Sequence, residues 1–192
     1  MTEGGQAQRA DAGLGIRAAV VHAAGDADLA AIQRIYAHHV LNGTGTFEER
    51  PPDRDEMAQR RAAVTERGLP YLVARTSGQS VCGFAYAAPF RPRSAYRFTI
   101  EDSVYVDPQA TGCGVGRLLL LELIERCTAL GYQQMVAVIG DAGNQGSIAL
   151  HRSAGFSDAG RLTAVGRKFD RWVDVVFMQR ALAARPPLAE IR

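Results

Sequence analysis

The sequence predicts a single mixed α/β domain in which helices cover both faces of one sheet. Strand-like and helix-like segments alternate along most of the chain, judged by the spacing of apolar residues. One strand leads through a glycine-rich loop into a long apolar helix, over residues 104–130. With 192 residues, 47% of them apolar, the chain is long enough for one domain with a sizeable core. We assign the domain to residues 16–182, between a leader (1–15) that we expect to be disordered and a Pro-containing tail (183–192).

Each predicted element rests on its local pattern. Asp26 is a candidate N-cap for a helix over residues 28–41, where apolar residues recur at helical spacing. A second helix begins after Pro51-Pro52-Asp53 and ends near Gly68. The other predicted helices are 115–130, which is apolar on nearly all sides, and 144–153. The predicted strands are residues 16–21, 71–74, 81–88, 100–106, 135–139, 162–168 and 172–179.

Composition and charge argue against several classes of function. The net charge of +2 and the scattered arginines do not suggest nucleic acid as a partner. The four histidines form no metal-ligand spacing, so we expect no metal. The three cysteines follow no paired spacing, which favours reduced thiols in a cytoplasmic protein. No apolar run resembles a signal peptide or is long enough to span a bilayer, so we expect no membrane partner.

The glycine-rich loop is the most informative segment. It reads Thr111-Gly112-Cys113-Gly114-Val115-Gly116-Arg117 and joins a strand to the start of a helix. Glycines let a ligand approach the backbone closely, and the unpaired N–H groups and dipole of a helix N-terminus favour phosphate. Arg117, in the first helical turn, adds a charge-assisted contact to such an anion. The loop therefore predicts a phosphate site, with a ligand-free glycine connection as the alternative.

Two common nucleotide motifs do not fit this loop. A dinucleotide fingerprint would need glycine at Arg117, and the acidic residue expected about 20 residues later is missing from Tyr132-Gln133-Gln134-Met135. A Walker loop would need Gly-Lys-Ser/Thr, which is absent. What remains is a pyrophosphate held by backbone alone, as in coenzyme A binding.

The sequence Thr111-x-x-Gly114-x-Gly116 resembles the acetyl-CoA signature (Gln/Arg)-x-x-Gly-x-Gly of the GCN5-related N-acetyltransferase (GNAT) superfamily, with Thr111 as a departure. Further stretches keep order and spacing between Ile16 and Gln179 and resemble the phosphinothricin and methionine sulfoximine acetyltransferase branch. These stretches are Phe84-Ala85-Tyr86-Ala87, Ala95-Tyr96, Glu101-Asp102-Ser103-Val104-Tyr105-Val106, Val136-Ala137-Val138-Ile139-Gly140, His151-x-x-x-Gly155-Phe156, Val165-Gly166-x-Lys168-Phe169 and Trp172-x-Asp174-Val175-x-Phe177-x-Gln179. The resemblance implies a mostly antiparallel sheet with one splayed parallel pair, acetyl-CoA as co-substrate and a homodimer.

The resemblance also implies a set of coenzyme-binding residues. Backbone groups of Val104 and Val106 would pair with the pantetheine arm as an added strand. Asn144 would contact the same arm through its side-chain amide. The full set is Val104, Tyr105, Val106, Gly112, Cys113, Gly114, Val115, Gly116, Arg117, Asn144 and Ser147.

Two residues are implied for catalysis. Glu101 resembles the family's general base, with a surface carboxylate as the alternative. Its reference pKa is low for a base, so burial must raise that pKa or a water must relay the proton. Asp102 faces the other side of the strand, so the two carboxylates cannot line one pocket. His151 occupies the place of the family's general acid, with simple packing beside the coenzyme as the alternative.

The acceptor is expected to be a small amino-acid analogue acetylated on its α-amino group, such as methionine sulfoximine, methionine sulfone or phosphinothricin. Arg91 and Arg93 suit bidentate capture of its oxygens, although each is equally a solvated loop charge. The implied wall of the acceptor pocket is Phe47, Tyr86 and Tyr96. The run Trp172-Val173-Asp174-Val175 departs from the Trp-His-Asp-Val of phosphinothricin enzymes, which favours a broader acceptor range.

Two alternatives to this function stay open. One is acetylation of another amine, such as an aminoglycoside or a protein N-terminus. The other is a non-catalytic acyl-CoA-binding module, against which the presence of both Glu101 and His151 argues, since binding alone needs neither.

Overall fold

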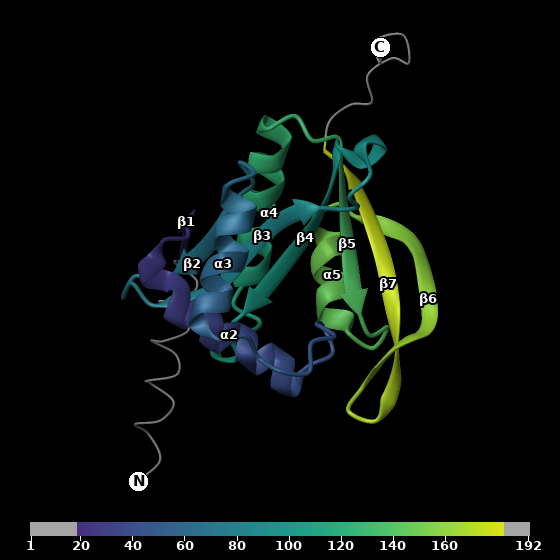
Figure 1. Ribbon diagram of the computed structural model, residues 1–192, viewed down its shortest axis with the longest axis horizontal. Helices are drawn as coiled ribbons and strands as arrows, with labels where there is room; N and C mark the ends of the chain where they lie inside the picture. The colour runs from purple at the N-terminus through teal and green to yellow at the C-terminus, as the bar shows by residue number, and fades with distance from the viewer. Residues whose placement is uncertain (1–18, 183–192) are drawn as a thin grey trace.

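The computed structural model describes residues 19–182, which form one seven-stranded sheet with the order β1-β2-β3-β4-β5-β7-β6 (Figure 1). The strands are β1 (Val20–Ala23), β2 (Tyr71–Arg75), β3 (Val81–Pro89), β4 (Thr99–Val106), β5 (Gln134–Gly140), β6 (Ser157–Lys168) and β7 (Arg171–Ala181). The helices are α2 (Leu29–Asn42), α3 (Arg54–Thr65), α4 (Val115–Ala129) and α5 (Gln145–Ser153), with short 3₁₀ turns η1 (Asp26–Asp28), η2 (Ser94–Tyr96) and η3 (Pro108–Ala110). The predicted leader, the predicted tail and residues 16–18 of the predicted first strand lie outside the described residues.

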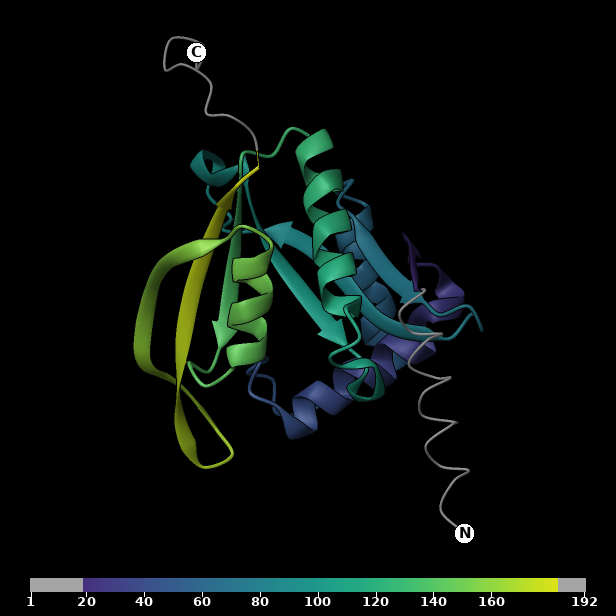
Figure 2. The ribbon, with the colours of Figure 1, turned by 180° about the vertical axis from the view of Figure 1, so that it is seen from behind.

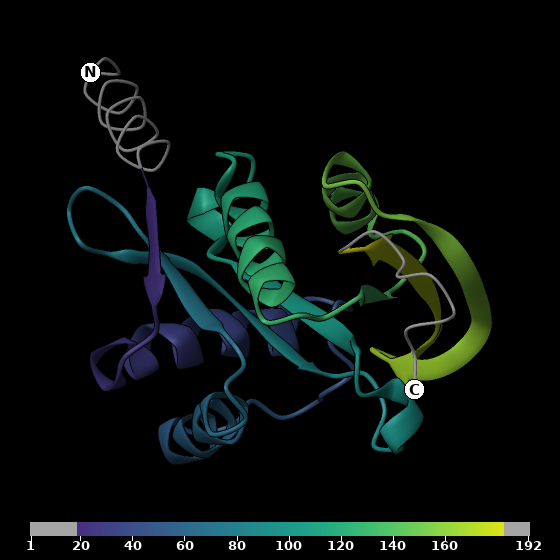
Figure 3. The ribbon, with the colours of Figure 1, turned by 90° about the horizontal axis from the view of Figure 1, so that it is seen from above.

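Helices cover both faces of the sheet, as the sequence predicts. Helices α2 and α3 lie on one face, and α4 and α5 lie on the other (Figures 2 and 3). Each face has its own apolar core. Ile32 and Ile35 of α2 are fully buried with Phe84 of β3 on one face. Leu119 of α4 and Met135 of β5 are fully buried on the other. Burying these side chains is the main force that holds the helices to the sheet.

The parallel pair β4–β5 separates partway along its length. The pairing runs from Thr99 opposite Gln134 to Asp102 opposite Ala137 and then stops. Beyond that point β4 stays with β3 and β5 stays with β7, so the ends of the two strands diverge (Figure 2). We call the gap between residues 103–106 and 138–140 the fork. The predicted splayed parallel pair in a mostly antiparallel sheet is thus confirmed.

Most predicted boundaries agree with the structure within a few residues, and two local predictions need correction. Asp26 does not cap the first helix, because the turn η1 precedes α2 and the carboxylate of Asp28 accepts a hydrogen bond from the N–H of Gly25 at 2.9 Å. β6 begins at Ser157 rather than at 162, since its exposed residues lack the alternation that marks a half-buried strand. Among residues 19–182, no helix has the length and apolarity needed to cross a membrane.

Candidate active site

A cleft of about 640 Å³ opens at the fork, on the face of the sheet that carries α4 and α5. Most of the predicted coenzyme-binding residues line it, namely Val104, Tyr105, Val106, Gly112, Gly114, Val115, Gly116, Arg117, Asn144 and Ser147. Cys113 does not line the cleft; its half-buried thiol turns back toward the carbonyl oxygen of Thr111. The structure therefore brings together residues from β4, the glycine loop and α5 around one cavity.

The start of α4 is shaped for an anion. Gly114 occupies the N-cap position with a φ of 86°, a left-handed conformation that favours glycine, and no side chain caps the helix there. By contrast, Asp53 Oδ1 accepts from the N–H of Glu56 at the start of α3, at 2.8 Å. The first-turn N–H groups of α4 thus remain for a ligand in the cleft, which fits the pyrophosphate of coenzyme A.

Two polar groups in the cleft are already partly engaged. Asn144 Oδ1 accepts from the N–H of Ser147 at 3.2 Å and so caps α5, which leaves the amide N–H₂ for a ligand. The carbonyl oxygen of Val106, which the resemblance implies as an acceptor for the pantetheine arm, already accepts a hydrogen bond from His39 Nε2 at 2.8 Å. No local pattern in the sequence marks His39, because only the fold brings α2 to the end of β4.

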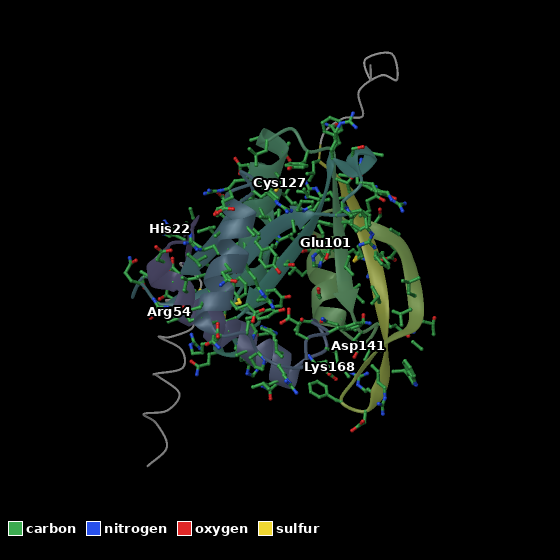
Figure 4. The ribbon with its side chains drawn as sticks, viewed as in Figure 1. His22, Arg54, Glu101, Cys127, Asp141 and Lys168 are labelled. Carbon is green, nitrogen blue, oxygen red and sulfur yellow. The ribbon has the colours of Figure 1, made fainter. Side chains whose placement is uncertain are left out.

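Asp102 contacts His151 of α5, and alternate residues of a strand point to opposite faces, so Glu101 lies on the face that carries α2 and α3. Figure 4 shows it near the middle of the sheet. Its side chain is half-buried. Burial raises the pKa of Glu101, the charge of Asp102 raises it further, and the charge of Arg91 opposes the shift. A carboxylate whose pKa is raised is a better base than an ordinary carboxylate.

His151 is buried and bonded through both ring nitrogens. Nδ1 lies 2.7 Å from the carbonyl oxygen of Ser147, and Nε2 lies 2.9 Å from Asp102 Oδ2. The two residues are 4% and 6% exposed. Burial lowers the pKa of His151, but the hydrogen bond and charge of Asp102 outweigh it, so that the pKa is raised. Sequence analysis assigned Asp102 to the face opposite Glu101 and missed its partner, because no local pattern links residues 102 and 151.

The predicted acceptor residues do not gather in one cavity. Phe47 lies at the C-terminal end of β5, where its ring packs against Gly140 and Gly166. Tyr86 stacks on Tyr71 with ring centroids 5.0 Å apart and lines a smaller cavity of about 250 Å³ beside α3. Arg91, Arg93 and Tyr96 are exposed and precede β4, at the other end of the parallel pair. The start of β4 and Phe47 are separated by about six residues of β5, which corresponds to roughly 20 Å along a strand.

A loop after α2 closes the open end of the fork. We call residues 43–49 the clasp. Thr44 Oγ1 donates to Asp141 Oδ2 at 3.0 Å, and Lys168 Nζ donates to the carbonyl oxygen of Thr46 at 2.8 Å. Asp141 and Lys168 both lie at the lower end of the sheet in Figure 4. Gly166 is required beside the clasp, because a Cβ there would overlap the ring of Phe47.

Comparison with known proteins agrees with this architecture. The chain is 54% identical over 177 residues to a phosphinothricin N-acetyltransferase of Alcaligenes faecalis, covering 92% of this chain and 89% of the relative. It is 43% identical over 164 residues to an L-methionine sulfoximine/L-methionine sulfone acetyltransferase of Pseudomonas paraeruginosa, covering 84% and 93%. The crystal structure of a phosphinothricin acetyltransferase from Sinorhizobium meliloti in complex with acetyl-CoA is similar with a TM-score of 0.84 and 48% identity, over 89% of this chain and 94% of that one.

The family itself is also matched directly. The model of the acetyltransferase (GNAT) family matches residues 32–156, a span that includes β4, the glycine loop, α4 and α5. The resemblance inferred from the glycine loop is therefore confirmed, and the chain belongs to the acetyltransferase (GNAT) family.

Proposed function

We propose that this protein is an acetyl-CoA-dependent N-acetyltransferase that acts on the α-amino group of a small amino-acid analogue. One observation carries the proposal: a cleft suited to coenzyme A lies at the fork on one face of the sheet, and the half-buried Glu101 lies just before the fork on the same strand. Family membership and the names of the relatives support both the coenzyme and the acceptor class.

In this proposal the two halves of the site hold one reactant each. The glycine loop binds the pyrophosphate of acetyl-CoA, and its pantetheine arm follows β4 toward the fork. The acceptor ammonium lies on the Glu101 side and gives up a proton to that carboxylate. The neutral amine then attacks the thioester carbon, the C–S bond breaks with its electron pair on sulfur, and His151 gives the sulfur a proton. The attacking nitrogen, positively charged after the bond forms, loses its second proton to solvent; Glu101 releases the first proton to solvent, and His151 takes one proton back.

The identity of the acceptor is proposed from the names of the relatives and from two arginine side chains. Relatives are named for phosphinothricin and for methionine sulfoximine or sulfone, all amino acids with an oxygen-rich side chain. Arg91 and Arg93 are the proposed partners of those oxygens, and Arg91 is close enough to Glu101 to lower its pKa. Tyr86, which is close enough to Glu101 for the two charges to interact, is proposed to contact the acceptor's side chain. Phe47 and Tyr96 are proposed on the family resemblance alone, because they lie at opposite ends of the parallel pair and cannot both contact one small acceptor within a single chain.

An acceptor panel tests the proposal. Release of free thiol from acetyl-CoA is measured with methionine sulfoximine, methionine sulfone, phosphinothricin, an aminoglycoside and a peptide with a free N-terminus. The proposal expects turnover with at least one of the three amino acids and little with the other two amines. Coenzyme binding without turnover on any acceptor would favour a non-catalytic module, and turnover only on the aminoglycoside or the peptide would favour that alternative.

Site-directed variants test the role of Glu101. We expect Glu101→Gln to reduce kcat by about 10²-fold, the size typical of a positioned acid or base, while the affinity for acetyl-CoA stays unchanged. Glu122→Gln is the matched control, because Glu122 lies on α4 and pairs with Arg126 away from the cleft. Unchanged turnover in Glu101→Gln would contradict the assignment.

We further propose that the protein is a cytoplasmic homodimer. Exposed apolar residues gather on the β6–β7 hairpin, which supports an interface there: Leu162, Val165, Phe169 and Trp172. The three cysteines are unpaired, and two of them are buried, which supports a reducing compartment. Light scattering with Trp172→Glu tests the dimer, since a charge at the interface would shift the mass toward a monomer.

A further inference from the structure

We propose that Asp102 is the positioning residue of this site: it fixes the ring of His151 and keeps a transferable proton on Nε2. The inference rests on the proposed acetyl transfer at the fork, and it adds a residue to which no role was assigned above. Asp102 touches no reactant in this proposal and acts only through His151.

The hydrogen bonds of His151 determine where its protons lie. The carbonyl oxygen of Ser147 can only accept, so Nδ1, at 2.7 Å, must carry a hydrogen. A neutral ring would then have a bare lone pair on Nε2, facing Asp102 Oδ2 at 2.9 Å. Two acceptors at that distance repel each other, so a proton lies between them. The proposal assigns this proton to Nε2, which makes the ring an imidazolium beside a carboxylate.

The buried surroundings leave the ring of His151 as the main partner of the Asp102 carboxylate. The side chains of His151 and Asp102 are 5% and 2% exposed, so water screens their charges little. Asp102 Oδ1 is buried and has no hydrogen-bond partner among the described residues, which leaves His151 as the compensating group for the carboxylate. The ring of Phe156 packs edge-on against His151, with centroids 5.1 Å apart, and limits its rotation.

The other titratable groups near the pair do not replace Asp102. Cys127 on α4 faces it, and burial together with the charge of Asp102 raises the pKa of this thiol to about 12, so it stays neutral. Glu101 points to the opposite face of β4 and is itself an acid. Ser147 offers His151 only a hydroxyl at 3.4 Å and its carbonyl oxygen.

Asp102 and His151 lie where the Nε2 proton can reach the departing sulfur of the coenzyme. Asp102, opposite Ala137, is the last paired residue of β4 before the strands part, and both Asp102 and His151 line the coenzyme cleft. The thioester sulfur leaves with the electron pair of the C–S bond, replaces Asp102 Oδ2 as the acceptor of the Nε2 hydrogen and takes that proton, and His151 recovers a proton from solvent. Without Asp102 the neutral ring would keep its single proton on Nδ1, where Ser147 holds it, and Nε2 would have none to give.

The test separates positioning from structural support. In Asp102→Asn we expect the pKa of His151, followed by NMR of the imidazole nitrogens without any substrate, to fall. The descending alkaline limb of the pH profile of kcat should move to lower pH with it, so that kcat near pH 8 falls at least about tenfold. Affinity for acetyl-CoA should stay within about twofold. Asp28→Asn is the matched control, because Asp28 is another buried aspartate, paired with Arg75 away from the cleft.

Three outcomes would overturn the inference. The first is an unchanged His151 titration in Asp102→Asn, and the second is an equal loss of kcat at every pH. The third needs only the wild-type protein and holds even if the variant does not fold: a ring that is neutral at pH 7, with its proton on Nδ1 alone. Failure of the proposed function is distinguishable, because the NMR titration requires no acetyl transfer. A wild-type enzyme inactive on every acceptor, with the expected titrations, would sink the acetyl transfer and leave the proton placement standing.

Discussion

The ammonium group of Lys168 donates a hydrogen bond to the carbonyl oxygen of Thr46 at 2.8 Å and ties the end of β6 to the clasp. Lys168 is the only lysine of the chain, and its side chain is buried, with 2% of the residue exposed. Burial lowers the pKa of its ammonium group, and the charges of Glu49 and Glu48 oppose that shift. The energetic burden of a buried ammonium suggests a positional role, and the residue that follows Thr46 is Phe47, a proposed wall of the acceptor pocket.

Removing the ammonium of Lys168 is therefore expected to loosen the clasp. Lys168→Met keeps most of the apolar stem but leaves the Thr46 carbonyl without its donor, which should reduce the free energy of unfolding by about 1–3 kcal/mol. The KM of the acceptor should rise several-fold, while the dissociation constant of acetyl-CoA changes little. Arg167→Met is the control, since Arg167 is exposed and pairs only with Asp170. A weaker coenzyme affinity with an unchanged acceptor KM would contradict this role.

The raised pKa of Glu101 has a consequence for stability. Because the pKa in the folded state lies above the ordinary 4.5, the folded protein binds more protons than the unfolded chain between the two values, and ionisation destabilises the fold at higher pH. Glu101→Gln, which resembles the protonated form, should therefore raise the free energy of unfolding at pH 7. The gain should vanish below about pH 4.5, where both states are protonated. Urea denaturation at pH 4 and pH 7 measures it, and equal differences at both values would count against the assigned environment.

Arg117 is expected to contribute charge to coenzyme binding. It lines the cleft in the first turn of α4, beside the uncapped N–H groups. Arg117→Ala should weaken acetyl-CoA by about 1.5–3 kcal/mol, the value of a charge-assisted hydrogen bond, and the difference from wild type should shrink at high salt. Calorimetric titration at two salt concentrations measures it. Arg126→Ala is the control, because Arg126 is on the same helix but pairs with Glu122, and it should leave the affinity for acetyl-CoA unchanged. An equal loss of affinity in both variants would show that Arg117 acts only through the net charge of the protein and not through a direct contact.

Gly166 and Phe47 are expected to be energetically coupled. A Cβ at Gly166 would overlap the Phe47 ring, so Gly166→Ala should reduce the free energy of unfolding by about 1–3 kcal/mol, as overpacking does. In a Phe47→Leu background the same substitution should have a smaller effect, because the smaller side chain leaves space. Denaturation of the four proteins of this double-mutant cycle gives the coupling. Additive effects would show that the clash is relieved elsewhere.

Local patterns were enough to predict most of the fold and many of the residues that line the cleft at the fork. The apolar spacing of residues 28–41 and 115–130 predicts α2 and α4 within a residue or two, because amphipathic burial imposes the period that the sequence then displays. The glycine loop predicts a phosphate site because glycine and an open helix N-terminus are local properties. The predicted start of β6, residue 162, is wrong, because an exposed edge strand that begins at Ser157 has no buried face to give an alternating pattern.

Contacts between distant segments could be decided only by the tertiary structure. Asp102 and His151 are 49 residues apart, and Lys168 and Thr46 are 122 residues apart. Neither contact can be read from the spacing of apolar residues, because each residue fits the local pattern of its own helix, strand or loop without its partner. The sequence by itself determined the elements, the glycine loop and the family resemblance. The tertiary structure decided that the fork opens after Asp102. It also decided that Asp102 holds His151 while Glu101 faces away from it, because alternate residues of a strand point to opposite faces of the sheet.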